Sequence, residues 1–96
     1  MKWTNNPEFD NQKTAEAEVL GAIYSLRVGR PVIFTDCHGN IPSAAVGPFA
    51  CGIRKVANSR DEANQNIFCD DAVETVYGGF RTVREAKAAA EEAMSN

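Results

Sequence analysis

The segment 82–85, Thr-Val-Arg-Glu, is the feature that most constrains the fold of this chain. A Thr followed three residues later by a Glu forms a capping box, in which the Thr hydroxyl and the Glu carboxylate each accept a hydrogen bond from backbone N–H groups at a helix start. The Ala-rich residues 86–94 that follow favour a helix. We therefore predict a helix from Thr82 with an inward face small enough to lie close against a sheet. That face consists of Val83, Ala86, Ala90, Ala93 and Met94.

An N-terminal helix is also predicted, between Thr14 and Leu26. Apolar residues recur there at helical spacing: Val19, Ala22, Ile23 and Leu26. Thr14 is a suitable cap for the first turn. Gly29 and Pro31 are suitable stop signals, because Gly adopts the left-handed conformation and Pro cannot continue a helix.

Short β-branched and aromatic runs, separated by turn residues, predict an antiparallel sheet between the helices. The strand candidates cover residues 31–36, 41–47, 49–56, 67–69 and 73–77. Phe49, Cys51 and Ile53 alternate and are expected to face the core, and the glycines at 78–79 are expected to end the sheet. The sequence thus predicts a single α+β domain over residues 1–96. Its antiparallel sheet has three to five short strands, flanked in sequence by an N-terminal and a C-terminal helix, with both helices on one face.

Residues 1–13 are polar and show no periodicity, and we interpret them as a lead-in that Trp3 and Phe9 attach to the domain or to a partner. They lack the apolar stretch of a signal peptide, and no apolar run in the chain approaches the ~18 residues that a spanning helix requires. The three cysteines are an odd number, which fits free thiols in a reducing compartment better than a secreted disulfide framework. We therefore expect a cytoplasmic protein whose cysteines are small buried hydrophobes.

Composition excludes several classes of function. The 96-residue length leaves room for one domain, and 44% hydrophobic and 24% charged residues are ordinary for a soluble globular protein. The net charge of -3 is too weak for a DNA mimic and has the wrong sign for a general nucleic-acid binder. We expect no nucleic-acid partner, no membrane partner and no cofactor.

Residues 36–40, Asp-Cys-His-Gly-Asn, follow the apolar run 32–34 and form the one stretch with the look of a catalytic motif. This stretch resembles the first metal-binding motif of calcineurin-like metallophosphoesterases, in which a strand ends in Asp-x-His-Gly and the Asp and His hold a metal. The resemblance implies metal ligation by Asp36 and His38. That family completes a two-metal site from later motifs with further histidines. Here His38 is the only histidine, and the later motifs are missing.

Two other chemistries remain open for the thiols. A catalytic cysteine needs a base to lower the pKa of its thiol, and His38 is available to Cys51 or Cys69 across the sheet. The neighbouring Cys37 is less suitable, because successive side chains on a strand point to opposite faces. A zinc site would have to use Cys37, His38, Cys51 and Cys69, but the chain has no Cys-x-x-Cys pair. We predict neither a catalytic residue nor a metal site.

The start of the C-terminal helix is a candidate anion-binding site. A helix N-terminus presents free N–H groups and a partial positive charge, and Arg side chains nearby add to it. An anionic ligand would also explain why Arg84 lies in the first turn, where a cation is unfavourable. A salt bridge to a nearby carboxylate would explain it equally well. The candidate residues are Gly79, Arg81, Thr82 and Arg84.

With catalysis poorly supported, we expect a small non-catalytic interaction protein that binds and modulates another protein. Chains of this size are typical of phage or mobile-element accessory proteins, including inhibitors of host defence complexes. Mixed charge suits a protein partner, and self-association through a sheet edge would give a homodimer. The alternative is a small anion- or nucleotide-binding protein, or a minor Cys/His or metal-dependent enzyme. The partner-binding candidates are Arg54, Lys55, Arg60, Asp61 and Glu62.

Overall fold

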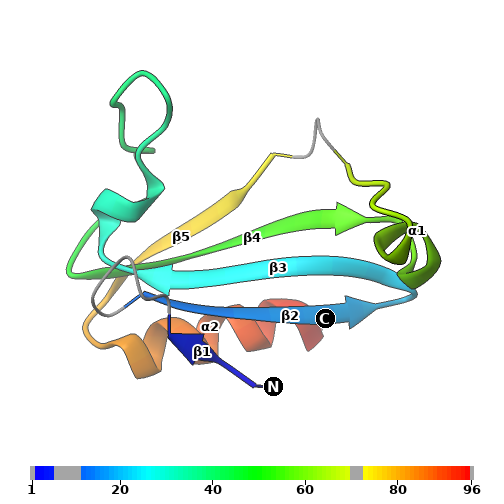
Figure 1. Cartoon of the computed structure of the whole chain (residues 1–96). Coiled ribbons are helices and arrows are strands. Elements are labelled where there is room, and N and C mark those ends of the chain that lie inside the picture. Colours follow the sequence, from blue (N-terminus) through cyan, green and yellow to red (C-terminus); the bar gives the residue numbers. More distant parts are fainter. Residues whose placement is uncertain (1, 6–11, 70–72, 96) are drawn as a thin grey trace.

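A computed structural model describes residues 2–5, 12–69 and 73–95. It contains a five-stranded antiparallel sheet in which each strand pairs with the next along the chain (Figure 1). The strands are β1 Thr4–Asn5, β2 Lys13–Val19, β3 Ala22–Gly29, β4 Phe49–Ala57 and β5 Thr75–Phe80. The helical elements are the 3-10 helix η1 Pro31–Phe34, α1 Arg60–Asn64 and α2 Val83–Ser95. The predictions of an α+β fold, an antiparallel sheet and a C-terminal helix are confirmed.

Helix α2 lies along one face of the sheet and closes the main core (Figure 1). Its start is the predicted capping box, in which the Thr82 hydroxyl accepts from the Glu85 N–H at 3.1 Å. The fully buried Ala86 and Ala90 bring the helix close to the sheet, and the rest of the predicted inward face is partly buried against the same core. The buried members of this core are Leu26, Val28, Cys51, Ile53, Ala86 and Ala90.

The predicted N-terminal helix is wrong, because the region forms the β2–β3 hairpin. Leu20 and Gly21 have φ of 51° and 84°, the left-handed backbone of a two-residue hairpin turn. In β2, Ala15 and Ala17 pack towards α2, and the alternating Glu16 and Glu18 face the other side. The helical spacing of the apolar residues arose from two strands that meet at this turn.

Several further predictions need correction. Residues 31–34 form η1 instead of a strand, since Pro31 at the helix start favours helical φ. Neither 41–47 nor 67–69 is a strand. Strand β5 continues through the 78–79 glycines to Phe80.

In the described residues, only α2 lies on the face of the sheet where both helices were predicted. Helix α1 begins at Arg60, whose guanidinium bonds Glu16 at 2.8 Å on the face opposite α2. The prediction that both helices lie on one face of the sheet is therefore also wrong. The face opposite α2, called the open face below, is bounded by η1 near one end and by α1 at the other (Figure 1).

The lead-in is attached to the domain by Trp3. Its indole N–H donates to Glu91 Oε1 at 2.9 Å, and Lys87 Nζ lies 5.9 Å from its ring centroid. Phe9 lies outside the described residues. No helix in the described part of the chain is both long enough and apolar enough to cross a membrane.

Candidate functional site

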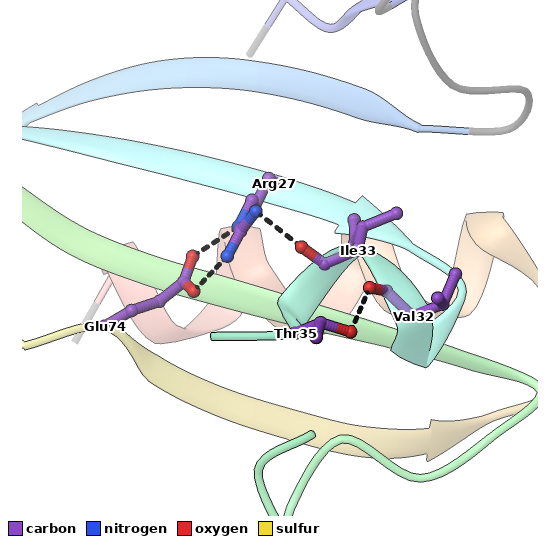
Figure 2. A network of polar contacts seen from close by, with 5 residues as sticks. All are labelled: Arg27, Val32, Ile33, Thr35 and Glu74. Atoms are coloured by element: carbon purple, nitrogen blue, oxygen red, sulfur yellow. Dashed lines mark hydrogen bonds and ion pairs between the residues drawn. The ribbon is translucent and has the colours of Figure 1, made fainter. Parts of the chain in front are cut away.

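The most connected polar group on the open face is Arg27 (Figure 2). Its Nε and Nη2 each donate to one carboxylate oxygen of Glu74 at 2.6 Å, and its Nη1 donates to the Ile33 carbonyl at 2.9 Å. The Phe34 ring centroid lies 4.6 Å from Arg27 Cζ. Gly52 is needed beneath this cluster, because a Cβ there would lie 2.7 Å from Phe34 Cε1. The cluster fastens η1 and the start of β5 to the sheet, so the charges of Arg27 and Glu74 are already matched.

A depression of about 280 Å³ lies next to this cluster, lined by Ser25, Arg27, Arg54 and Glu74. Ser25 and Arg54 are direct cross-strand neighbours. Glu74 is held by Arg27, and the guanidinium of Arg54 has no hydrogen bond or ion pair with any described residue. Among the described residues, the depression therefore combines one unmatched cation with a hydroxyl.

The five predicted partner-binding residues do not form one surface. Arg54 and Arg60 lie towards the open face, whereas Lys55 is directly opposite Tyr24 on the α2 side. Glu62 belongs to the cap of α1, since its N–H donates to the Ser59 hydroxyl at 3.1 Å and its carboxylate accepts from the Asn58 N–H at 3.2 Å. Asp61 is exposed in the first turn of α1.

The candidate anion site is partly occupied by groups of this chain. The Glu85 carboxylate accepts from the Arg81 N–H at 2.8 Å, and the Thr82 hydroxyl caps the helix. The Gly79 N–H donates to the Val46 carbonyl at 2.9 Å. Arg81 and Arg84 are exposed. The backbone donors that an anion would use are thus partly occupied.

The 36–40 stretch forms a closed turn. Asp36 Oδ1 accepts from the N–H groups of His38 at 2.8 Å and Asn40 at 2.9 Å, and Gly39 has φ of 83°. A 3-10 helix precedes the turn, in place of the strand that the metallophosphoesterase-like motif requires. Within residues 2–5, 12–69 and 73–95, no three or more His, Cys, Asp or Glu gather in a way that suits a metal ion. The Asp36 carboxylate therefore has a structural role in the turn.

The three cysteines occupy different environments. Cys51 is fully buried, Cys69 is half-buried and Cys37 is exposed, so the prediction that all three are buried holds only for Cys51. Burial raises the pKa of the Cys51 thiol to about 11, with a smaller increase from the Glu74 charge and an opposing effect of the Tyr77 backbone. A protonated thiol in the core is not a nucleophile at neutral pH.

Strand β5 provides a surface that sequence reasoning missed. Between β5 and α2 lies a groove of about 280 Å³ lined by Tyr77, Phe80, Ala89, Glu92 and Ala93. Eight large apolar side chains are exposed in the described residues, and five of them lie on β5, just before it, beside its end, or beside the end of the neighbouring β4. These five are Val46, Ile67, Phe68, Val73 and Tyr77. We call them, with the groove, the β5 surface.

Two hydrogen bonds place the flanking segments of the β5 surface. The Gly79 N–H bonds the Val46 carbonyl, which puts the 44–46 segment beside the end of β5. The Cys69 N–H donates to the Val56 carbonyl at 2.8 Å, which puts the 67–69 segment beside the end of β4. The apolar 73–77 run was the available sequence signal, but its place at the sheet edge follows only from the topology.

Comparison of the chain with protein-family models, with curated proteins and with solved structures finds no significant match.

Proposed function

We propose that this chain is a non-catalytic protein-interaction module whose partner docks on the β5 surface. The observation that carries the proposal is that, among the described residues, five of the eight exposed large apolar side chains lie on β5, just before it, or beside the ends of β5 and β4. Groups of exposed large apolar side chains on soluble proteins often mark interaction sites, and aromatic residues such as Tyr77 are enriched in protein interfaces.

The position of β5 adds support. It is the last strand of the sheet, so its outer edge carries unpaired backbone groups that another chain can use. The opposite edge strand is β1, which pairs with only Lys13 and Thr14 of β2. In the part of β2 that β1 does not cover, Glu16 and Glu18 carry charges of the kind that discourage pairing. Most polar side chains of the open face form hydrogen bonds or ion pairs within this chain. We therefore favour the β5 surface as the docking site over the face on which charged partner-binding residues were predicted.

Site-specific photo-crosslinking tests the docking surface in the cells that make this protein. A photoreactive phenylalanine replaces Tyr77, and a matched variant carries it at Leu20, which is fully exposed in the distant β2–β3 turn. We expect one dominant crosslinked protein from position 77 and none from position 20. The purified partner should then bind the Tyr77→Glu variant at least ~10-fold more weakly than the wild type, about 1.4 kcal/mol. Equal crosslinking at both positions, or unchanged affinity, would contradict the proposal. That the partner belongs to a host defence complex stays a prediction.

Arg54 favours a second candidate function, the binding of a small anion on the open face. Its guanidinium lacks a partner in the described residues and lies beside the Ser25 hydroxyl. Titration with inorganic phosphate, followed by NMR, should shift the Ser25 and Arg54 amides in the wild type and not in Arg54→Gln. Shifts confined to Arg81 and Arg84 would instead indicate the start of α2.

A further inference from the structure

The depression beside Arg54 continues across the open face towards β1. A second depression, of about 420 Å³, is lined by Lys2, Glu16 and Ser25 among others, and Ser25 lines both depressions. Glu16 on β2 and Arg54 on β4 are the direct cross-strand neighbours of Ser25. Lys2 lies two residues before Thr4 of β1. The two depressions, which we call the trough, therefore cross the strands with Lys2 on one side of Ser25 and Arg54 on the other.

Both carboxylates that line the trough are already bound by arginines of this chain. Arg27 donates two hydrogen bonds to the carboxylate of Glu74, each of 2.6 Å. Arg60 donates to Glu16 Oε1 at 2.8 Å. The negative charges of Glu16 and Glu74 are thus matched, and they oppose an anionic ligand less than free carboxylates would.

The trough also presents hydrogen-bond donors that the described part of the chain does not use. Among the described residues, no hydrogen bond or ion pair involves the side chains of Lys2, Ser25 or Arg54. An ammonium and a guanidinium can only donate, and a hydroxyl can donate as well as accept. The Thr4 and Thr14 hydroxyls, 3.1 Å apart, line the same trough. A ligand that suits these groups is anionic and rich in acceptors.

The separation of the two cations favours a ligand with several anionic groups in a line. Lys2 continues the line of β1 and Arg54 lies on β4, so three strand spacings of ~4.8 Å, about 14 Å, separate their backbones. Both side chains are long enough to lean towards Ser25 from opposite sides. A single phosphate contacts one of the two cations, whereas a chain of three phosphate groups can contact both. Arg and Lys are both common phosphate ligands.

We propose that the trough binds a linear polyphosphate chain, with Lys2 and Arg54 at its two ends and the Ser25 hydroxyl between them. The proposal rests on the anion binding proposed for Arg54 as a second candidate function, and it adds Lys2 as the residue that selects a longer anion. It is independent of docking on the β5 surface, whose groove lies on the α2 side of the sheet.

NMR titrations at fixed ionic strength compare sodium tripolyphosphate with inorganic phosphate. Tripolyphosphate should shift the amides of Thr14, Ser25 and Arg54 and bind at least ~10-fold more tightly than phosphate, because it contacts both cations. ATP carries the same chain on a nucleoside and should shift the same amides. Tighter binding of ATP than of tripolyphosphate would identify a nucleotide as the source of the chain, and equal or weaker binding of ATP an inorganic chain.

Three substitutions separate binding by both cations from binding at Arg54 alone. Lys2→Gln should weaken the binding of tripolyphosphate at least ~10-fold and leave that of phosphate unchanged. Arg54→Gln should weaken the binding of both. Lys55→Gln is the matched control, since it removes the same charge one position further along β4, on the α2 side, and should leave both affinities unchanged.

The outcomes distinguish this proposal from the simpler anion site. Equal affinities of the wild type for phosphate and tripolyphosphate, or equal effects of Arg54→Gln and Lys55→Gln, would overturn polyphosphate binding in the trough. Tighter binding of a single-stranded oligonucleotide than of tripolyphosphate would also overturn it. If phosphate shifts Ser25 and Arg54 but Lys2→Gln has no effect on tripolyphosphate, only the role of Lys2 and the longer chain is wrong. If neither anion shifts these amides, the second candidate function is wrong as well.

Discussion

Arg27 and Glu74 lie 47 positions apart in the sequence, yet their side chains form two parallel hydrogen bonds of 2.6 Å across the open face. Both are largely shielded from water, with 32% and 22% of the side chain exposed. Removing one partner leaves a half-buried charge without its counter-ion. We expect Glu74→Ala to lower the free energy of unfolding by about 1–3 kcal/mol in urea denaturation.

An exposed ion pair supplies the control for this prediction. Glu16→Ala breaks the contact with Arg60, whose side chain is 47% exposed, so the urea midpoint should stay close to that of the wild type. Replacing both Arg27 and Glu74 by Met should recover part of the loss seen in Glu74→Ala, because no unpaired charge remains. Equal losses for Glu16→Ala and Glu74→Ala would show that Arg27 does not fasten η1 and β5.

Gly78→Ala tests the contact between β5 and the 44–46 segment. A Cβ at Gly78 would overlap the Ala44 carbonyl oxygen and lie 2.6 Å from the Val46 nitrogen, both of them backbone atoms. We expect a loss of about 1–3 kcal/mol in the free energy of unfolding, measured by thermal or urea denaturation. At Gly47 a Cβ would meet only Pro31 Cγ at 3.7 Å, so Gly47→Ala should be much milder.

The thiols should differ sharply in reactivity. Brief maleimide treatment of the native protein at pH 7.5, followed by peptide mass spectrometry, should label Cys37 and leave Cys51 unmodified until urea is added. Labelling of Cys51 at the rate of Cys37 would contradict the buried core position.

The raised pKa of Cys51 also predicts a dependence of stability on pH. The pKa of an unfolded thiol is about 8.5, whereas burial raises the pKa of the folded Cys51 thiol to about 11. Between these values the unfolded state binds fewer protons, so the Cys51 contribution makes the free energy of unfolding fall as pH rises. Comparison with Cys51→Val isolates this effect, since the variant should show a shallower decline over the same pH window.

The two helix caps should contribute unequally to the free energy of unfolding. Thr82→Ala removes the cap of α2, which buries Ala86 and Ala90 in the main core, and should lower the free energy of unfolding by about 0.5–2 kcal/mol. Ser59→Ala removes the equivalent bond in α1, a five-residue helix without buried residues. Its effect on global unfolding in urea should be smaller. A larger effect of Ser59→Ala would mean that α1 secures more of the fold than its burial indicates.

The parts of the fold that local chemistry determines were predictable. The Thr82–Glu85 box marked the start of α2, and the alternation of Phe49, Cys51 and Ile53 marked the inner side of β4. The β2–β3 hairpin was not predictable, because its apolar residues also recur at helical spacing. The turn at Leu20–Gly21 decides between the two, and Leu with positive φ is rare enough that sequence gives little warning of it.

The candidate site was less predictable than the fold. The predicted charged residues are neighbours in sequence, but the alternation of strand side chains separates Arg54 from Lys55. Glu62 takes part in the N-terminal cap of its own helix, α1. The β5 surface joins residues from both ends of a strand, a flanking loop and α2, so it exists only after the strand order is fixed.

The contact between Trp3 and Glu91 determines how the molecule can be held. It places the C-terminal part of α2 beside the residue that precedes β1, on the side of the sheet that lies farthest from β5. A surface tether attached ahead of Trp3 or beyond α2 would therefore leave from the same side of the domain. Immobilised by either route on a sensor chip, the protein would present β5 towards the flowing solution.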